Sequence, residues 1–166
     1  CTTAPAPAEC AGELLTALTS VAEESFFGFF TPLDADACDT IVADSVREWL
    51  HVTVAFSGPF DGSLHAAVPA ALSGELLAAF LGRAPDDALD PGDVDDMARE
   101  FANMVCGLWL SRRCPDAIFT LEGPVARRGR EHPAGWRHTG ARAIGVLNDH
   151  PVAVWLHPGA DRPAED

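Results

Sequence analysis

The segment from Asp93 to Arg113 constrains the fold most, because its pattern is that of a long amphipathic helix. At about 100° per residue, its apolar side chains fall on one broad stripe. That stripe comprises Val94, Met97, Phe101, Met104, Val105 and Leu108. Asp90-Pro91 suits the start of such a helix, and Arg112 and Arg113 suit the negative end of its dipole. A helix of this kind must bury its stripe against a second layer.

Shorter patterns supply the second layer. Val46 to Phe56 alternates apolar and polar residues, which predicts a strand with one face in water. The other expected elements are helices over 9–30 and 72–81 and strands over 63–68, 117–121, 125–128, 141–147 and 152–156. We expect Leu72, Leu76, Leu77 and Phe80 on the buried side of the second helix. This order predicts an α+β fold with long helices packed on one face of a mainly antiparallel sheet.

The length of 166 residues predicts a single domain, which we place at 9–158. Residues 1–8 read as a disordered tail and 159–166 as a flexible C-terminal tail. With 11 arginines, no lysine and 25 acidic residues, the net charge is −14, which argues against nucleic-acid and anionic-membrane partners. Apolar runs are far shorter than the roughly 20 residues that cross a bilayer. The pattern therefore predicts a globular protein that needs no membrane.

The cysteine count argues for a reducing compartment, so we expect a cytoplasmic location. There are five cysteines, an odd number, without any C-x-x-C spacing, which argues against a disulfide framework. His132 and His138 flank a short loop but lack a third ligand at helical or hairpin spacing. We therefore expect no metal site.

The helix over 93–113 also carries a second stripe, formed by Asp96, Glu100, Asn103 and Gly107. An exposed helix surface ordinarily contains acidic residues, so a solvated face is one reading. Asn and Gly are poor helix formers, however, and Gly costs about 1 kcal/mol relative to Ala. Two such residues on one stripe favour the alternative reading, a functional face.

The same residues resemble a known family. The string Asp96-Met-Ala-Arg-Glu100-Phe-Ala-Asn103 resembles the D/S-x3-E-x2-N signature of the CheC/CheX/FliY chemotaxis phosphatases. EFANMVCG, from Glu100 to Gly107, is similar to the E-x-x-N-M-v-x-G of CheX-like domains. The flanking strings GSLHAAV (62–68) and FTLEGPV (119–125) resemble two strands of the family. The resemblance covers roughly residues 10–157 and implies a CheX-like domain.

The resemblance implies a phosphatase that hydrolyses the phosphoaspartate of a CheY-like response regulator. Asn103 would orient the attacking water, and Glu100 would pair with the active-site Lys of the regulator. Asp96 and Gly107 would bind the partner, with Asp96 at the edge of the contact in a weaker, orienting role. This chain would hold no cofactor, because the Mg²⁺ belongs to the phosphorylated receiver domain. Relatives form dimers through their sheets, so a homodimer is a further expectation.

One departure from the family pattern concerns the number of sites. Some relatives carry a second E-x-x-N on the N-terminal helix, but Glu23 and Glu24 are each followed three residues later by Phe. We therefore expect one site per chain, and Phe26, Phe27, Phe29 and Phe30 mainly as core or interface packing. The other reading is a non-catalytic adaptor that binds a receiver or another signalling partner. Arg127, Arg128 and Arg130 form a basic cluster that is either a solvated strand edge or a docking surface.

Overall fold

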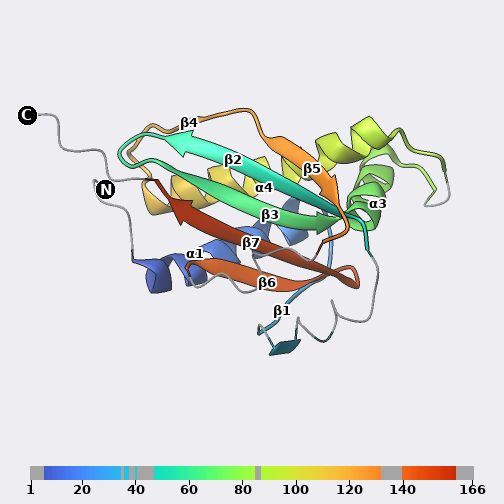
Figure 1. Cartoon of the computed structure of the whole chain (residues 1–166), viewed down its shortest axis with the longest axis horizontal. Coiled ribbons are helices and arrows are strands. Elements are labelled where there is room, and N and C mark those ends of the chain that lie inside the picture. Colours follow the sequence, from blue (N-terminus) through green and yellow to red (C-terminus); the bar gives the residue numbers. More distant parts are fainter. Residues whose placement is uncertain are drawn as a thin grey trace, which may run out of the picture.

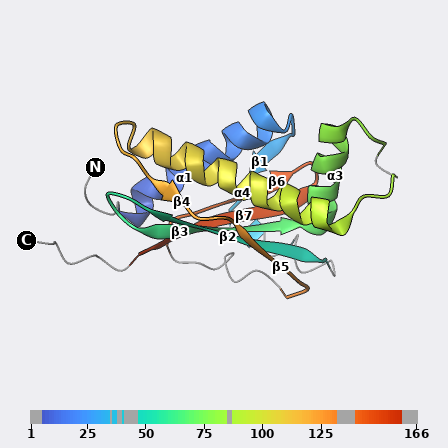
Figure 2. The same ribbon diagram turned by 90° about the horizontal axis from the view of Figure 1, so that it is seen from above.

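The chain forms two layers, with helices on one face of a single sheet (Figure 1, Figure 2). The structure is a computed structural model that describes residues 6–34, 36–37, 40, 47–84, 87–131 and 140–159. Its helical elements are α1 (Pro7–Ser20), the π-helical turn η1 (Val21–Ser25), α3 (Ala70–Leu81) and α4 (Pro91–Arg113). Its strands are β1 (Phe30–Pro32), β2 (Trp49–Ser57), β3 (Gly62–Pro69), β4 (Thr120–Leu121), β5 (Val125–Gly129), β6 (Arg142–Leu147) and β7 (His150–Pro158). The expected α+β architecture is confirmed.

Every strand pairing in the seven-stranded sheet is antiparallel. The strand order is β1-β6-β7-β3-β2-β4, and β5 pairs with β2 beside β4. Two hairpins form, β2 with β3 and β6 with β7. The second one turns at Asn148 and Asp149, which have φ angles of 47° and 67°. Asn and Asp tolerate this left-handed region, which tight hairpin turns require.

Alternation along β2 separates the two faces of the sheet. Leu50, Val52, Val54 and Phe56 are buried in the main core together with residues of α1, α3 and α4. His51 and Thr53 lie on the opposite face and are half-buried. The prediction of a strand with one polar face is therefore confirmed, but β2 begins only at Trp49, and Val46, its expected first residue, lies outside the described part of the chain.

α4 crosses the helical layer, and its ends are stabilised as its sequence predicts. The Asp90 carboxylate accepts a hydrogen bond from the Gly92 N–H at 2.8 Å and so caps the first turn. α1 runs antiparallel to α4: Arg113 binds Glu13 at 2.8 Å at one end, and Phe26 meets Phe101 at the other. The two helices lie side by side over the sheet in Figure 2.

The N-terminal helix was expected to continue to Phe30, and this boundary is wrong. The helical region ends at Ser25, and Phe30 instead begins the edge strand β1, where it pairs with Leu147. The cause is a reversal of the backbone at Phe27, which has a φ of 54°. The Gly28 N–H then donates to the Ala22 carbonyl at 2.9 Å and closes the helix end. At the other end, α1 begins at Pro7, two residues earlier than expected.

Phe80 was expected on the buried side of α3 but is 77 % exposed. It lies in the last turn, where the neighbouring Leu81 is also exposed, so the end of α3 has no layer to cover it. Leu72, Leu76 and Leu77 are buried as expected. The helix stops at Gly82, whose φ of 64° is left-handed.

Cys114 is disulfide-bonded, with a partner outside the described residues. This bond departs from the expectation that the cysteines stay reduced, and the spacing of the cysteines gave no sign of it. Cys10 and Cys106 are buried and free. Among the described residues, no helix is long and apolar enough to cross a membrane.

Cys106 is expected to resist alkylation in the folded chain. Burial against the core raises the pKa of its thiol to about 12. At pH 8 only roughly one thiol in 10⁴ is then the reactive thiolate. Mass spectrometry after iodoacetamide treatment should show Cys106 unmodified in native protein and modified after denaturation in urea. Rapid native labelling of Cys106 would contradict the buried packing of α4.

Candidate functional site on helix α4

The second stripe of α4 faces away from the sheet. Val94, Phe101, Val105 and Trp109 are buried on the inner side of the helix. On the outer side, Asp96 and Glu100 are exposed, while Asn103 and Gly107 are half-exposed. The structure therefore places these four sequence-predicted residues together on one solvent-facing line, as the helical spacing indicated.

Asn103 presents a free carboxamide at the centre of this line. No hydrogen bond or other polar contact of its side chain occurs within the described part of the chain. A carboxamide both donates and accepts hydrogen bonds and is neutral at every working pH. It can therefore hold a water molecule without competing with the charge on a phosphoryl group. One turn before it, the Glu100 carboxylate is also exposed and makes no ion pair with a described residue.

Asp96 differs from Glu100, because it already forms an ion pair with Arg99 on the same helix. Its side chain is 69 % exposed, so the pair contributes little to stability. A partner surface that approaches α4 thus meets one carboxylate that is already paired and one that is not. The unpaired one, Glu100, is the better candidate to bind a cation of the partner.

Gly107 leaves bare backbone beside Asn103, and the chain's own packing does not require it. A Cβ atom built at Gly107 would meet nothing within 4 Å. The residue lies in the middle of a 23-residue α-helix, where its helical conformation suits any residue type. The glycine thus weakens the helix without relieving any internal clash.

Replacing Gly107 with alanine is expected to raise the free energy of unfolding by about 0.5–1 kcal/mol. Urea denaturation monitored by circular dichroism measures this. Gly12 is a matched control, because it also lies within a helix with open space around its Cβ position. Gly12→Ala should stabilise the chain to a similar degree. Destabilisation by Gly107→Ala alone would show that the glycine is a packing requirement after all.

A rigid support underlies the stripe. Phe26 packs against Phe101 with ring centroids 5.6 Å apart. Near the other end of α4, Trp109 lies in an aromatic cluster with Phe56 and Phe60, at centroid distances of 6.0 and 6.3 Å. Such ring contacts stabilise beyond their buried area. They hold α4 firmly on the sheet, so that the stripe is presented in one orientation.

The basic cluster of Arg127, Arg128 and Arg130 is divided between the two faces of the sheet. Arg128 points toward the helical layer and binds Asp95 at 2.7 Å and Glu48 at 2.8 Å. These partners raise the pKa of Arg128. Arg127 lies on the opposite face, beside His51 in the strand register. Within the described ranges, neither Arg127 nor Arg130 forms an ion pair.

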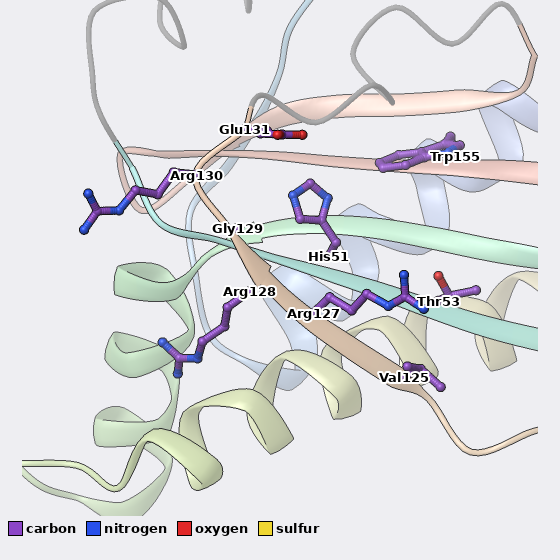
Figure 3. A pocket seen from close by; sticks show the side chains of 9 residues that line it. All are labelled: His51, Thr53, Val125, Arg127, Arg128, Gly129, Arg130, Glu131 and Trp155. Carbon is purple, nitrogen blue, oxygen red and sulfur yellow. The ribbon is translucent and has the colours of Figure 1, made fainter.

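An open pocket of about 840 Å³ lies beside Arg127 on the sheet face away from the helices (Figure 3). His51 and Thr53 of β2, and Trp155 of β7, also line it. Burial lowers the pKa of His51, and Glu131 at the pocket rim partly opposes this shift. This pocket was not predicted from the sequence, although period-2 alternation along β2 and β5 places His51 and Arg127 on one face. The pocket is separate from the α4 stripe.

A metal centre has no candidate in the described ranges, where no three His, Cys, Asp or Glu side chains group together. His132 and His138, which the sequence analysis weighed as a metal pair, lie outside the described residues. The exposed acids Glu23 and Glu24 lie on η1, next to the α4 stripe but without an amide three residues later.

Comparisons with known proteins identify the fold. A family model described as "Chemotaxis phosphatase CheX" matches residues 50–144, more than half of the chain. A CheX crystal structure from Desulfovibrio desulfuricans is 18 % identical with a TM-score of 0.66, covering 91 % of this chain and 99 % of its own. CheX from Vibrio vulnificus is 20 % identical with a TM-score of 0.66, covering 92 % and 98 %.

A CheX–CheY–BeF3–Mg²⁺ complex from Borrelia burgdorferi is 13 % identical with a TM-score of 0.57, covering 90 % of this chain and 97 % of the matched one. The curated protein sequences contain no significant match. The structural matches share the helix-on-sheet architecture at low identity, and the family model spans β2 to the start of β6, including the α4 stripe. The chain therefore belongs to the CheX chemotaxis phosphatase family.

Proposed function

We propose that this chain hydrolyses the phosphoaspartate of a CheY-like receiver domain, with Asn103 and Glu100 as the functional pair. The observation that carries the proposal is the unpaired, outward-facing carboxamide of Asn103, one turn from the unpaired carboxylate of Glu100. The family is one of chemotaxis phosphatases, and the similar Borrelia chain forms a complex with CheY, BeF3 and Mg²⁺.

The chemistry needs positioning more than covalent catalysis. A water oxygen attacks the phosphorus, the bond between phosphorus and the aspartyl oxygen breaks, and the products are inorganic phosphate and the free aspartate carboxylate. The proton released from the water passes to phosphate and solvent. Asn103 would accept one hydrogen bond from the water and hold its lone pair in line with the breaking bond.

Glu100 would act by binding rather than by chemistry. Its carboxylate would pair with the Lys of the receiver active site, which fixes the position of Asn103 over the phosphoryl group. Gly107, on the same line, would let the receiver backbone approach α4 closely, which explains a glycine that the fold itself does not need. Asp96, already paired with Arg99, would lie at the edge of the contact. The Mg²⁺ that receivers require would remain in the receiver site.

The test is a dephosphorylation assay with a phosphorylated receiver domain and Mg²⁺, measuring phosphate release with and without the chain. Catalytic acceleration at substoichiometric chain concentration is the expected result. Stable binding of the receiver without faster phosphate release would refute the phosphatase and support an adaptor. The assay must use several receivers of the same organism, because the stripe does not identify the target.

A further inference from the structure

Two phenyl rings project into solvent from the loop between η1 and β1. The side chains of Phe27 and Phe29 are 86 % and 85 % exposed, whereas Phe26 is half-buried and Phe30 is buried. A folded chain ordinarily scatters single exposed apolar residues, whereas here two large exposed rings stand two residues apart in one loop. The fold does not use these rings for its core.

The backbone beneath the rings is held in an unfavourable conformation. Phe27 has a φ of 54°, in the left-handed region that an aromatic residue rarely adopts and that destabilises the folded chain. Glycine follows it, and a Cβ at Gly28 would lie 2.5 Å from the Cδ1 atom of Leu147, so a larger residue would force the Leu147 side chain to shift. Asn or Gly at position 27 would suit this conformation better than Phe.

The loop is also clamped from a distant part of the chain. The Phe29 N–H donates to the Asn148 Oδ1 at 2.9 Å, and the Asn148 N–H donates to the Phe29 carbonyl at 3.1 Å. Asn148 belongs to the β6–β7 turn, 119 residues away in sequence. The rings are thus presented on a fixed backbone, which is the arrangement of a preorganised binding surface.

The loop that carries the rings begins beside α4. Phe26 contacts Phe101, which directly follows Glu100. Because α1 and α4 are antiparallel, the end of η1 reaches the level of Glu100 along α4, and both helices lie on the same face of the sheet (Figure 2). A typical interface covers about 800 Å² per partner. A protein of this footprint that docks on Glu100 and Asn103 can therefore also reach this loop.

The exposed negative charges near the rings indicate what kind of partner surface can bind there. Glu23 and Glu24 on η1, and Asp96 and Glu100 on α4, are exposed carboxylates on this side of the molecule. A second copy related by a twofold axis would bring the same acids together, in a chain of net charge −14. An anionic membrane would be repelled as well. A basic protein surface with an apolar pocket is the complement.

We propose that Phe27 and Phe29 are the apolar anchors by which this chain docks its receiver partner, beside the Glu100–Asn103 pair. This inference rests on the proposed function for the identity of the partner. The two rings would enter an apolar pocket of the receiver, while the surrounding carboxylates meet basic side chains at the rim. Large aromatic anchors within a polar rim are typical of residues that dominate binding energy.

The experiment compares Phe27→Asn and Phe29→Ser with Ile118→Ser. Ile118 is 89 % exposed and lies beyond the opposite end of α4, so it controls for the loss of exposed apolar area. Binding of a receiver domain loaded with beryllofluoride and Mg²⁺ is measured by calorimetry. Each Phe substitution is expected to raise Kd at least about tenfold, while Ile118→Ser leaves Kd unchanged. In the phosphatase assay the same loss should appear in KM rather than kcat.

Thermal denaturation of each variant shows whether a loss of receiver binding is caused by a loss of folding. Phe27→Asn should keep or raise the melting temperature, because Asn tolerates the left-handed backbone. An unchanged Kd in both Phe variants, or no measurable receiver binding by the wild-type chain, would overturn the proposal. A wild-type dimer that Phe27→Asn converts to a monomer would overturn it too, because the rings would then be a self-interface. A wild-type chain that binds but does not hydrolyse would refute only the phosphatase, since the Kd ratios would still decide the docking.

Discussion

Replacing Asn103 with alanine is expected to lower the rate of receiver dephosphorylation by about 100-fold, with little change in receiver affinity. The carboxamide makes no hydrogen bond or ion pair with the described part of the chain, so its removal breaks no polar interaction of the folded chain. A poorly placed water costs roughly two orders of magnitude in rate. Single-turnover phosphate release from a saturated complex measures the chemical step, and calorimetry with the beryllofluoride-loaded receiver measures affinity.

Folding cannot account for such a loss, because alanine is the better helix former and should stabilise α4 slightly. Ser111→Ala on the same outward side of α4 is the matched control, since Ser111 bonds only to the Leu108 carbonyl of its own helix. It should leave the rate unchanged. A hydrolysis rate that survives Asn103→Ala would refute the catalytic role, whatever the affinity.

The fold followed from the sequence where one periodic pattern extends over many residues. The pattern of α4 covers 21 residues and carries Asp90 and the terminal arginines at its ends, so its inner and outer faces were predicted correctly. The predicted C-terminal boundary of the N-terminal helix was wrong, because the apolar pattern of the helix continues into Phe29 and Phe30. The reversal at Phe27 depends on Asn148 and Leu147, and contacts over such a sequence separation leave no local signal.

The stripe was predictable because helical spacing alone places its four residues on one line. The division of the arginine cluster was also accessible, because period-2 alternation along β5 puts Arg127 and Arg128 on opposite faces. The sequence could not predict which of the two carboxylates on the stripe is unpaired. Asp96 and Glu100 are the same type of residue on the same stripe, and only the position of Arg99 distinguishes them. The exposure of Phe27 and Phe29 likewise required the backbone geometry.

The charge of Glu100 can be removed without changing its shape, which separates its role from that of Asn103. Glu100→Gln is expected to raise the Kd for the activated receiver by at least about tenfold, because the partner Lys would then be desolvated without a countercharge. The salt dependence of binding should also become weaker, since one ion pair of the complex is lost. Calorimetry between 50 and 300 mM NaCl, over which the Debye length falls from above about 10 Å to below it, measures both effects.

Asp116→Asn provides the matched control, because Asp116 is exposed just beyond the far end of α4 and carries the same charge. If both variants weakened receiver binding equally, the effect would come from the overall negative charge of this chain and not from a specific ion pair of Glu100. The split between binding and rate decides the rest. A Glu100→Gln chain that binds normally but hydrolyses slowly would place the carboxylate in the chemical step. A chain that binds weakly but reaches the wild-type rate at saturation would leave the chemistry to Asn103 and the docking to Glu100.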